Sequence, residues 1–65
     1  MKCKVYDHQL NCYAFSEHIF PNKREAIDQL VSFFSVDCWG DLTKIRAELW
    51  ANGVFSELEI QGVEQ

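Results

Sequence analysis

PNKREAIDQLVSFFS, residues 21–35, carries the strongest structural signal in this chain of 65 residues. Asn22 is a favoured helix N-cap, and Glu25 stands three residues later, where its carboxylate can reach back to the cap. At about 100° per residue, the apolar side chains that follow occupy a single arc of about 160°. They are Ala26, Ile27, Leu30, Val31, Phe33 and Phe34. This pattern predicts an amphipathic helix over residues 23–35.

A second helix is predicted after Asp41, which is a good N-cap. Gly53 suits the left-handed position that ends many helices. The apolar stripe of this helix consists of Leu42, Ile45, Leu49 and Trp50, and we expect Trp50 to pack in the core. Arg46 interrupts the stripe, so it is expected either to stack on Trp50 or to pair with an acid across the helix interface.

Alternating residues on both sides of the helices predict strands. In residues 2–7, Cys3 and Val5 share one face, and the other face carries Lys2, Lys4 and Tyr6. Extended character returns at residues 12–15, which predicts a β-hairpin over residues 2–19. Residues 57–61 alternate again, with Leu58 and Ile60 inward and an acidic row, Glu57 and Glu59, outward. Such a row suits an edge strand.

These elements predict one domain, residues 1–65, of the α+β class. Its order is ββααβ: a three-stranded, mainly antiparallel sheet with two helices on one face. The order of the strands in the sheet stays open.

The composition argues against disorder, since 48% of the residues are hydrophobic and 14% aromatic. No apolar run approaches the roughly 20 residues of a membrane span, and no signal-peptide pattern is present. The three cysteines are an odd number and read as reduced thiols. We therefore expect a protein of the cytoplasm, without membrane association.

The charge is divided unevenly along the chain. In residues 1–24, four basic residues against two acidic ones give +2, and in residues 25–65, two against eight give −6. The two parts sum to the formal charge of −4. An acidic surface repels phosphate and attracts basic partners, which makes a protein partner with a basic surface the expected one.

Several residue patterns suggest a metal site or a catalytic residue, but none has the spacing or the neighbours that such a site requires. Cys3, His8, Cys12 and His18 are zinc-ligand types, but their alternating order lacks the paired spacing of closed zinc sites. Cys38 has acidic neighbours, which disfavour a thiolate nucleophile. Asp37 and Asp41 lack further nearby oxygens for a cation. Because no catalytic or nucleotide-binding motif is present, we expect no enzyme, no metal and no cofactor.

Nucleic-acid binding requires a basic surface. Lys4 and Tyr6 share a strand face, and Lys23 and Arg24 begin the first helix. Against a net charge of −4, nucleic acid is not the expected partner, although a hairpin-based module stays as an alternative.

Four segments together resemble a known type of protein: KCKVYD (2–7), KREAID (23–28), KIRAEL (44–49) and ELEI (57–60). In their layout they are similar to small acidic accessory proteins, mostly uncharacterised, of bacteriophages and prophages of Gram-positive bacteria. The resemblance implies binding to a host protein in the bacterial cell. Some proteins of that broad class inhibit CRISPR nucleases by masking a basic DNA-binding surface.

The resulting hypothesis is a non-catalytic protein-binding module. Glu25 and Asp41 already serve as helix-capping residues, which leaves other side chains as the predicted partner-binding set. That set is Asp28, Asp37, Trp39, Glu57 and Glu59, with Trp39 as a possible anchor. The alternative of a self-associating structural domain, and hence of a homodimer, also stays open.

Overall fold

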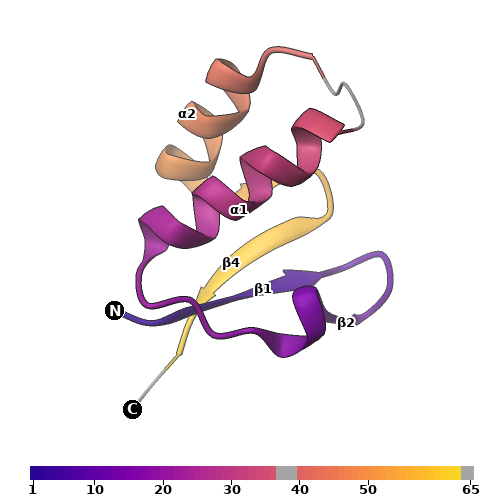
Figure 1. Ribbon diagram of the computed structural model, residues 1–65. Coiled ribbons are helices and arrows are strands. Elements are labelled where there is room, and N and C mark those ends of the chain that lie inside the picture. Colours follow the sequence, from indigo (N-terminus) through magenta and orange to yellow (C-terminus); the bar gives the residue numbers. More distant parts are fainter. Residues whose placement is uncertain (37–39, 64–65) are drawn as a thin grey trace.

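The computed structural model describes residues 1–36 and 40–63. Two helices lie on one side of an antiparallel sheet, which confirms the predicted α+β architecture (Figure 1). The helices are α1 (Lys23–Val36) and α2 (Leu42–Asn52). The strands are β1 (Cys3–Asp7), β2 (Cys12–Tyr13), β3 (Val54–Phe55) and β4 (Leu58–Gly62), and a single turn, η1, spans Phe15–Glu17.

The sheet has four strands in the order β2-β1-β4-β3, one more than the sequence predicted. The additional strand, β3, forms because the chain doubles back after Gly53 and pairs Phe55 with Leu58 across a tight turn. The expectation of an edge position for the last strand is wrong, since β4 lies between β1 and β3. Leu58 and Ile60 do pack against the core, as the alternation predicted.

Both helix starts follow the predicted capping. The side chain of Asn22 accepts a hydrogen bond from the Glu25 amide at 2.9 Å. The Asp41 carboxylate accepts from the amides of Thr43 and Lys44 at 3.0 and 3.2 Å. α2 ends at Gly53, whose φ of +73° is the predicted left-handed one.

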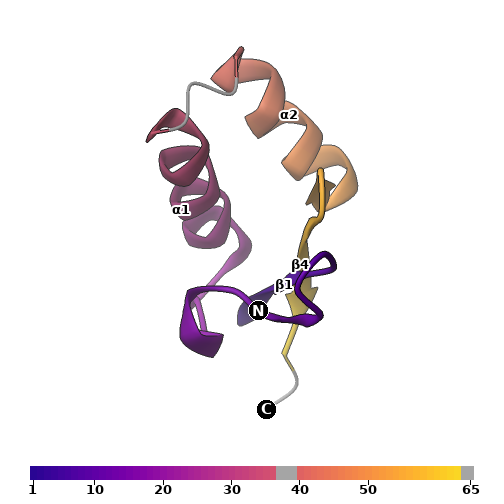
Figure 2. The same cartoon turned by 90° about the vertical axis from the view of Figure 1, so that its right-hand side faces the viewer.

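The core lies between α1, α2 and the sheet. Figure 2 shows α1 and α2 side by side on the same side of β1 and β4. The largest fully buried side chains come from all three layers: Phe34, Ile27, Leu30, Leu49 and Val5. Burial of each stabilises the fold by about 1.5–3 kcal/mol. Cys3 is buried beside Val5, as predicted.

Two aromatic residues assigned to the core stripes lie outside it. Phe33, which belongs to the apolar arc of α1, is 44% exposed, and Trp50 is 45% exposed, so the expectation that Trp50 packs in the core is wrong. On α2, Ile45 and Leu49 fill the contact with α1 and the sheet, and Trp50 points about 100° away from Leu49. Lys23 covers Trp50 instead, with its Nζ 5.4 Å from the ring centroid and bonded to the Trp50 carbonyl at 2.9 Å.

Arg46 takes the second of its two predicted roles. Its guanidinium contacts the Asp28 carboxylate of α1 at 2.5 Å, which joins the exposed sides of the two helices. The ion pair removes the apparent conflict of a charged residue in the α2 stripe.

The predicted second strand is shorter than residues 12–15. Only Cys12 and Tyr13 pair with β1, and the chain then turns through three residues with positive φ, from Phe15 (54°) to Glu17 (61°). It returns at Phe20, which exchanges two backbone hydrogen bonds with Cys3 at 2.7 and 3.0 Å.

In the part of the chain that the structure describes, neither helix has the length and apolar character required to cross a membrane.

Candidate binding groove

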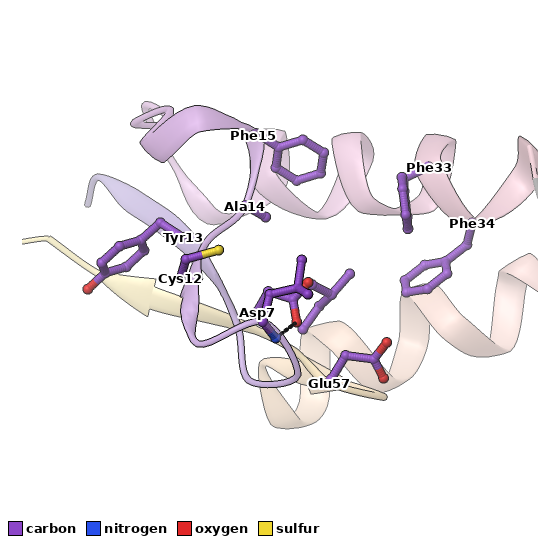
Figure 3. Close-up of a pocket in the computed structure, with 10 residues that line it drawn as sticks. Asp7, Cys12, Tyr13, Ala14, Phe15, Phe33, Phe34 and Glu57 are labelled. Atoms are coloured by element: carbon purple, nitrogen blue, oxygen red, sulfur yellow. Dashed lines mark hydrogen bonds between the residues drawn. The ribbon is translucent and has the colours of Figure 1, made fainter.

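An open cavity of about 440 Å³ lies at one end of the domain (Figure 3). Figure 1 shows this end on the right, where the β1–β2 turn, the β3–β4 turn and the last turns of α1 come together. We call it the end groove. Its lining residues are Asp7, Leu10, Cys12, Tyr13, Ala14, Phe15, Phe33, Phe34, Glu57 and Leu58.

Aromatic and aliphatic side chains build its walls. Phe34, which is 1% exposed, and Leu58, which is also buried, belong to the core and extend to the cavity. Phe33 lies 5.5 Å from Phe34 between ring centroids and reaches the surface. Leu10, at 69% exposure, stands on the β1–β2 turn. The groove therefore continues the core outward into an apolar surface that water contacts.

Phe15 belongs to the same wall because of an unusual backbone. The φ angles of Phe15, Ser16 and Glu17 are +54°, +55° and +61°, so η1 is a left-handed turn. Left-handed geometry costs about 1–2 kcal/mol per residue for side chains with a Cβ. The turn places the Phe15 ring 6.0 Å from Phe20 and 6.3 Å from Phe33, which offsets part of that cost.

Two half-buried carboxylates belong to the lining. Asp7 accepts hydrogen bonds from the amides of Gln9 and Leu10 at 2.9 and 3.1 Å, which holds the β1–β2 turn. Glu57 accepts a hydrogen bond from the Ser56 hydroxyl. None of the described residues that line the groove is basic. The groove is thus an apolar cavity with a local negative charge.

Cys12 lies on the short edge strand β2 and is an exposed free thiol. Figure 3 shows it beside the cavity, whereas the neighbouring Tyr13 ring points away from it. Cys3, by contrast, is buried. This difference gives the groove a thiol that reagents can reach.

The opposite, helix-free face of the sheet carries a second polar and aromatic cluster, which we call the outer sheet face. Its members are Lys4, Tyr6, His8, Tyr13, Glu59 and Gln61. Tyr6 meets Tyr13 and His8 edge to face at 5.1 and 4.8 Å between centroids. The Lys4 ammonium lies 4.7 Å from the Tyr13 centroid and 3.6 Å from Glu17. Lys4 and Tyr6 share this face, as predicted.

Glu59 is the acidic centre of the outer sheet face. Nε2 of His8 lies 2.6 Å from its Oε1, and the Gln61 amide donates to the same oxygen at 3.4 Å. Tyr13 donates in turn to Gln61 at 3.2 Å. The hydrogen bond from His8 is the largest influence that holds the pKa of the Glu59 carboxyl below its ordinary value of 4.5.

Three of the predicted partner-binding acids are among the described residues, and the structure does not bring these three together. Asp28 lies on α1 in its ion pair with Arg46, Glu57 lines the end groove, and Glu59 lies on the outer sheet face. Asp37 and Trp39 lie outside the described residues. Of the three predicted acids that the structure describes, Glu57 alone lines the end groove.

The four zinc-ligand types also point to different places. Cys3 is in the core, His8 contacts Glu59, Cys12 lines the groove, and His18 lies edge-on to Phe20 at 4.6 Å. Across residues 1–36 and 40–63, no group of three or more His, Cys, Asp or Glu side chains could hold a metal ion.

Sequence reasoning missed Leu10, Phe15 and Phe33 as groove residues. Phe33 did carry a signal, because it lies at one end of the apolar arc of α1. Leu10 is a lone apolar residue between polar neighbours in a turn. No local rule predicts the left-handed turn at Phe15, since none of its three residues is glycine or asparagine.

Comparison with protein-family models, with curated proteins and with solved structures gives no match to this chain. A proposal about its function therefore rests on the geometry of its own residues.

Proposed function

We propose that this chain is a non-catalytic protein-binding module that holds a side chain of its partner in the end groove. The observation that carries the proposal is an apolar cavity of about 440 Å³ with Leu10 and Phe33 exposed beside it. Ligand sites are typically concave, mostly apolar and of about 300–1,000 Å³. A 65-residue domain that leaves such side chains in water forgoes stability it needs, which favours a binding role.

The net charge of −4 favours a partner with a basic surface, because long-range attraction speeds encounter and selects the partner's sign. Glu57 is the acid best placed to act at close range. Asp28 and Glu59 already have partners, Arg46 and His8, within the domain. The phage accessory role, and inhibition of a nuclease by masking its DNA-binding surface, stay predictions within this proposal.

Self-association through sheet edges is less well supported. The edge strands β2 and β3 have two residues each, and residues with positive φ, Asn11 and Ser56, adjoin them. Little backbone is therefore available for pairing with a second copy. A homodimer through the end groove is a different matter, and sedimentation across micromolar concentrations would reveal it as a concentration-dependent mass.

The nucleic-acid alternative would use the outer sheet face, where two tyrosines and Lys4 lie together. Glu17 and Glu59 add two acidic groups there, which weakens attraction to phosphate. A labelled single strand that binds and whose binding falls steeply with salt would favour this alternative.

Cys12 offers a direct test of the groove. In a Cys38→Ser variant, a maleimide photo-crosslinker attached to the exposed Cys12 would sit at the cavity, since Cys3 is buried. After incubation in bacterial lysate and irradiation, we expect one predominant crosslinked protein. The yield of this crosslinked protein should fall at least about fivefold in Phe33→Gln, because that change removes an exposed apolar side chain from the groove lining.

The control variant is Ile19→Ser, which removes an exposed apolar residue outside the groove lining. It should leave the yield unchanged. Equal crosslinking in Phe33→Gln and in Ile19→Ser, or no crosslinked protein at all, would contradict the proposal.

A further inference from the structure

Charge and apolar surface coincide in the end groove, and this combination restricts the chemistry of the occupant. Phe15, Phe33 and Phe34 provide aromatic walls, while Asp7 and Glu57 provide two carboxylates. A purely apolar occupant would leave both carboxylates in a less hydrated environment without compensation, which costs free energy. An anionic occupant would be repelled.

Each of the two carboxylates has one oxygen to which no described residue donates a hydrogen bond. The hydrogen bonds to Asp7 from the amides of Gln9 and Leu10 both reach Oδ1, so its Oδ2 has no hydrogen-bond partner among the described residues. The Ser56 hydroxyl donates to Oε2 of Glu57, and Oε1 likewise has none in that part of the chain. No basic side chain lines the cavity among the described residues. The field in the groove is therefore negative, and low-dielectric walls strengthen it.

The aromatic rings of the groove also favour a cationic occupant. A cation near the face of a ring gains about 0.5–1 kcal/mol at exposed sites, and Phe15 and Phe33 are both accessible enough to offer one. Long basic side chains combine an apolar stem with a charged head, so they can contact the phenylalanines and the carboxylates together.

We propose that the partner side chain held in the end groove is arginine or lysine, with its aliphatic stem against Phe15 and Phe33 and its cation at Asp7 and Glu57. This inference rests on the proposed function and specifies the ligand of that same site. It differs from a general electrostatic attraction, because it requires Glu57 in particular and leaves Glu59 without a role.

Two small probes separate charge from shape. n-Butylguanidinium carries the head and stem of an arginine side chain, and n-butylurea is its neutral counterpart of nearly the same shape. Each would be titrated into the full chain at low salt while amide shifts are followed by ¹H–¹⁵N NMR. We expect the guanidinium to shift the amides of Leu10, Phe33 and Leu58 and to bind about fivefold or more tightly than the urea.

Two matched variants test whether the tighter binding of the guanidinium depends on the carboxylate in the groove. In Glu57→Gln, the advantage of the guanidinium over the urea should fall to about twofold or less, because a carboxylate is lost without a change in shape. In Glu59→Gln, which removes a carboxylate from the outer sheet face, the advantage should persist. The NMR spectrum of each variant reports whether the fold is intact.

Three outcomes would overturn the inference: equal binding of the two probes in the groove, an equal loss of preference in Glu57→Gln and Glu59→Gln, or shifts confined to amides outside the groove. The first would leave the proposed function standing with an apolar occupant. Failure of the Cys12 crosslinking experiment would instead remove the proposed function itself.

Discussion

The end groove and the outer sheet face contain similar side chains and use them differently. Each has aromatic rings beside carboxylates, and each involves β1 and β4. On the outer sheet face, Glu59 meets His8 and Gln61, and Lys4 meets Tyr13 and Glu17. In the groove, the acids are bonded by local turn groups, and apolar side chains remain open to water. Side chains that satisfy one another stabilise the domain, whereas those left open are available to a ligand.

The largest expected effect contrasts two phenylalanines that line the groove, the buried Phe34 and the exposed Phe33. Phe34→Ala should lower the free energy of unfolding by about 3–5 kcal/mol, because a fully buried ring is replaced by a cavity. Phe33→Ala should lower it by only about 1 kcal/mol, since its ring is 44% exposed. Urea unfolding would measure both. Similar losses of stability in the two variants would mean that Phe33 belongs to the core and that the groove is not a separate region.

The next effect concerns the left-handed turn that supports the groove wall. Ser16→Gly should raise the free energy of unfolding by about 0.5–1 kcal/mol, because glycine adopts a φ of +55° without the Cβ clash. Ser32→Gly, in the right-handed helix α1, should lower it by about 0.5 kcal/mol. Thermal melts of the two variants would be compared. A loss in both would show that residue 16 does not need the left-handed conformation.

The outer sheet face should respond to acid. Because the pKa of Glu59 is lower in the folded protein than its ordinary 4.5, its ionised form stabilises the fold above pH 4.5. That contribution is lost as the pH falls through the lowered pKa. It should not exceed about 1 kcal/mol, since the pair is exposed. Urea unfolding of Glu59→Gln should give a lower stability than the parent at pH 6 and an equal one at pH 2.5. A constant difference would exclude this role of the pair.

The smallest effect lies on the helices, away from both regions. Asp28→Asn should change the free energy of unfolding by no more than about 0.5 kcal/mol, because its pair with Arg46 is half exposed. If the groove holds the partner, crosslinking through Cys12 should also be unchanged in this variant. A marked loss of crosslinking would restore Asp28 to the partner-binding set that the sequence predicted.

Much of the fold follows from local signals. Asn22, Asp41 and Gly53 mark helix boundaries because caps act on backbone groups within one turn. The alternation of Cys3 and Val5 likewise predicts which face of β1 is buried. Strand β3 escaped prediction because it is two residues long and exists only through its pairing with β4.

The candidate site was much less predictable. Glu57 belonged to the predicted set on account of its charge, although the groove that surrounds it was not foreseen. Leu10, Phe34 and Leu58 come from three distant segments of the sequence, and no spacing rule connects them. Exposure of Phe33 and Trp50 depends on how far α1 and α2 cover the sheet, which helical periodicity alone does not specify.

The sequence by itself determined the two helices, the inward faces of the first and last strands, and the net charge of −4. These depend on periodicity, capping and composition, which act over a few residues or are simple sums. Tertiary structure alone decided that Asp28 meets Arg46, that Glu59 meets His8, and that Glu57 borders an apolar cavity. Such outcomes depend on contacts between distant segments, and a charge has a different role according to the partner that folding brings to it.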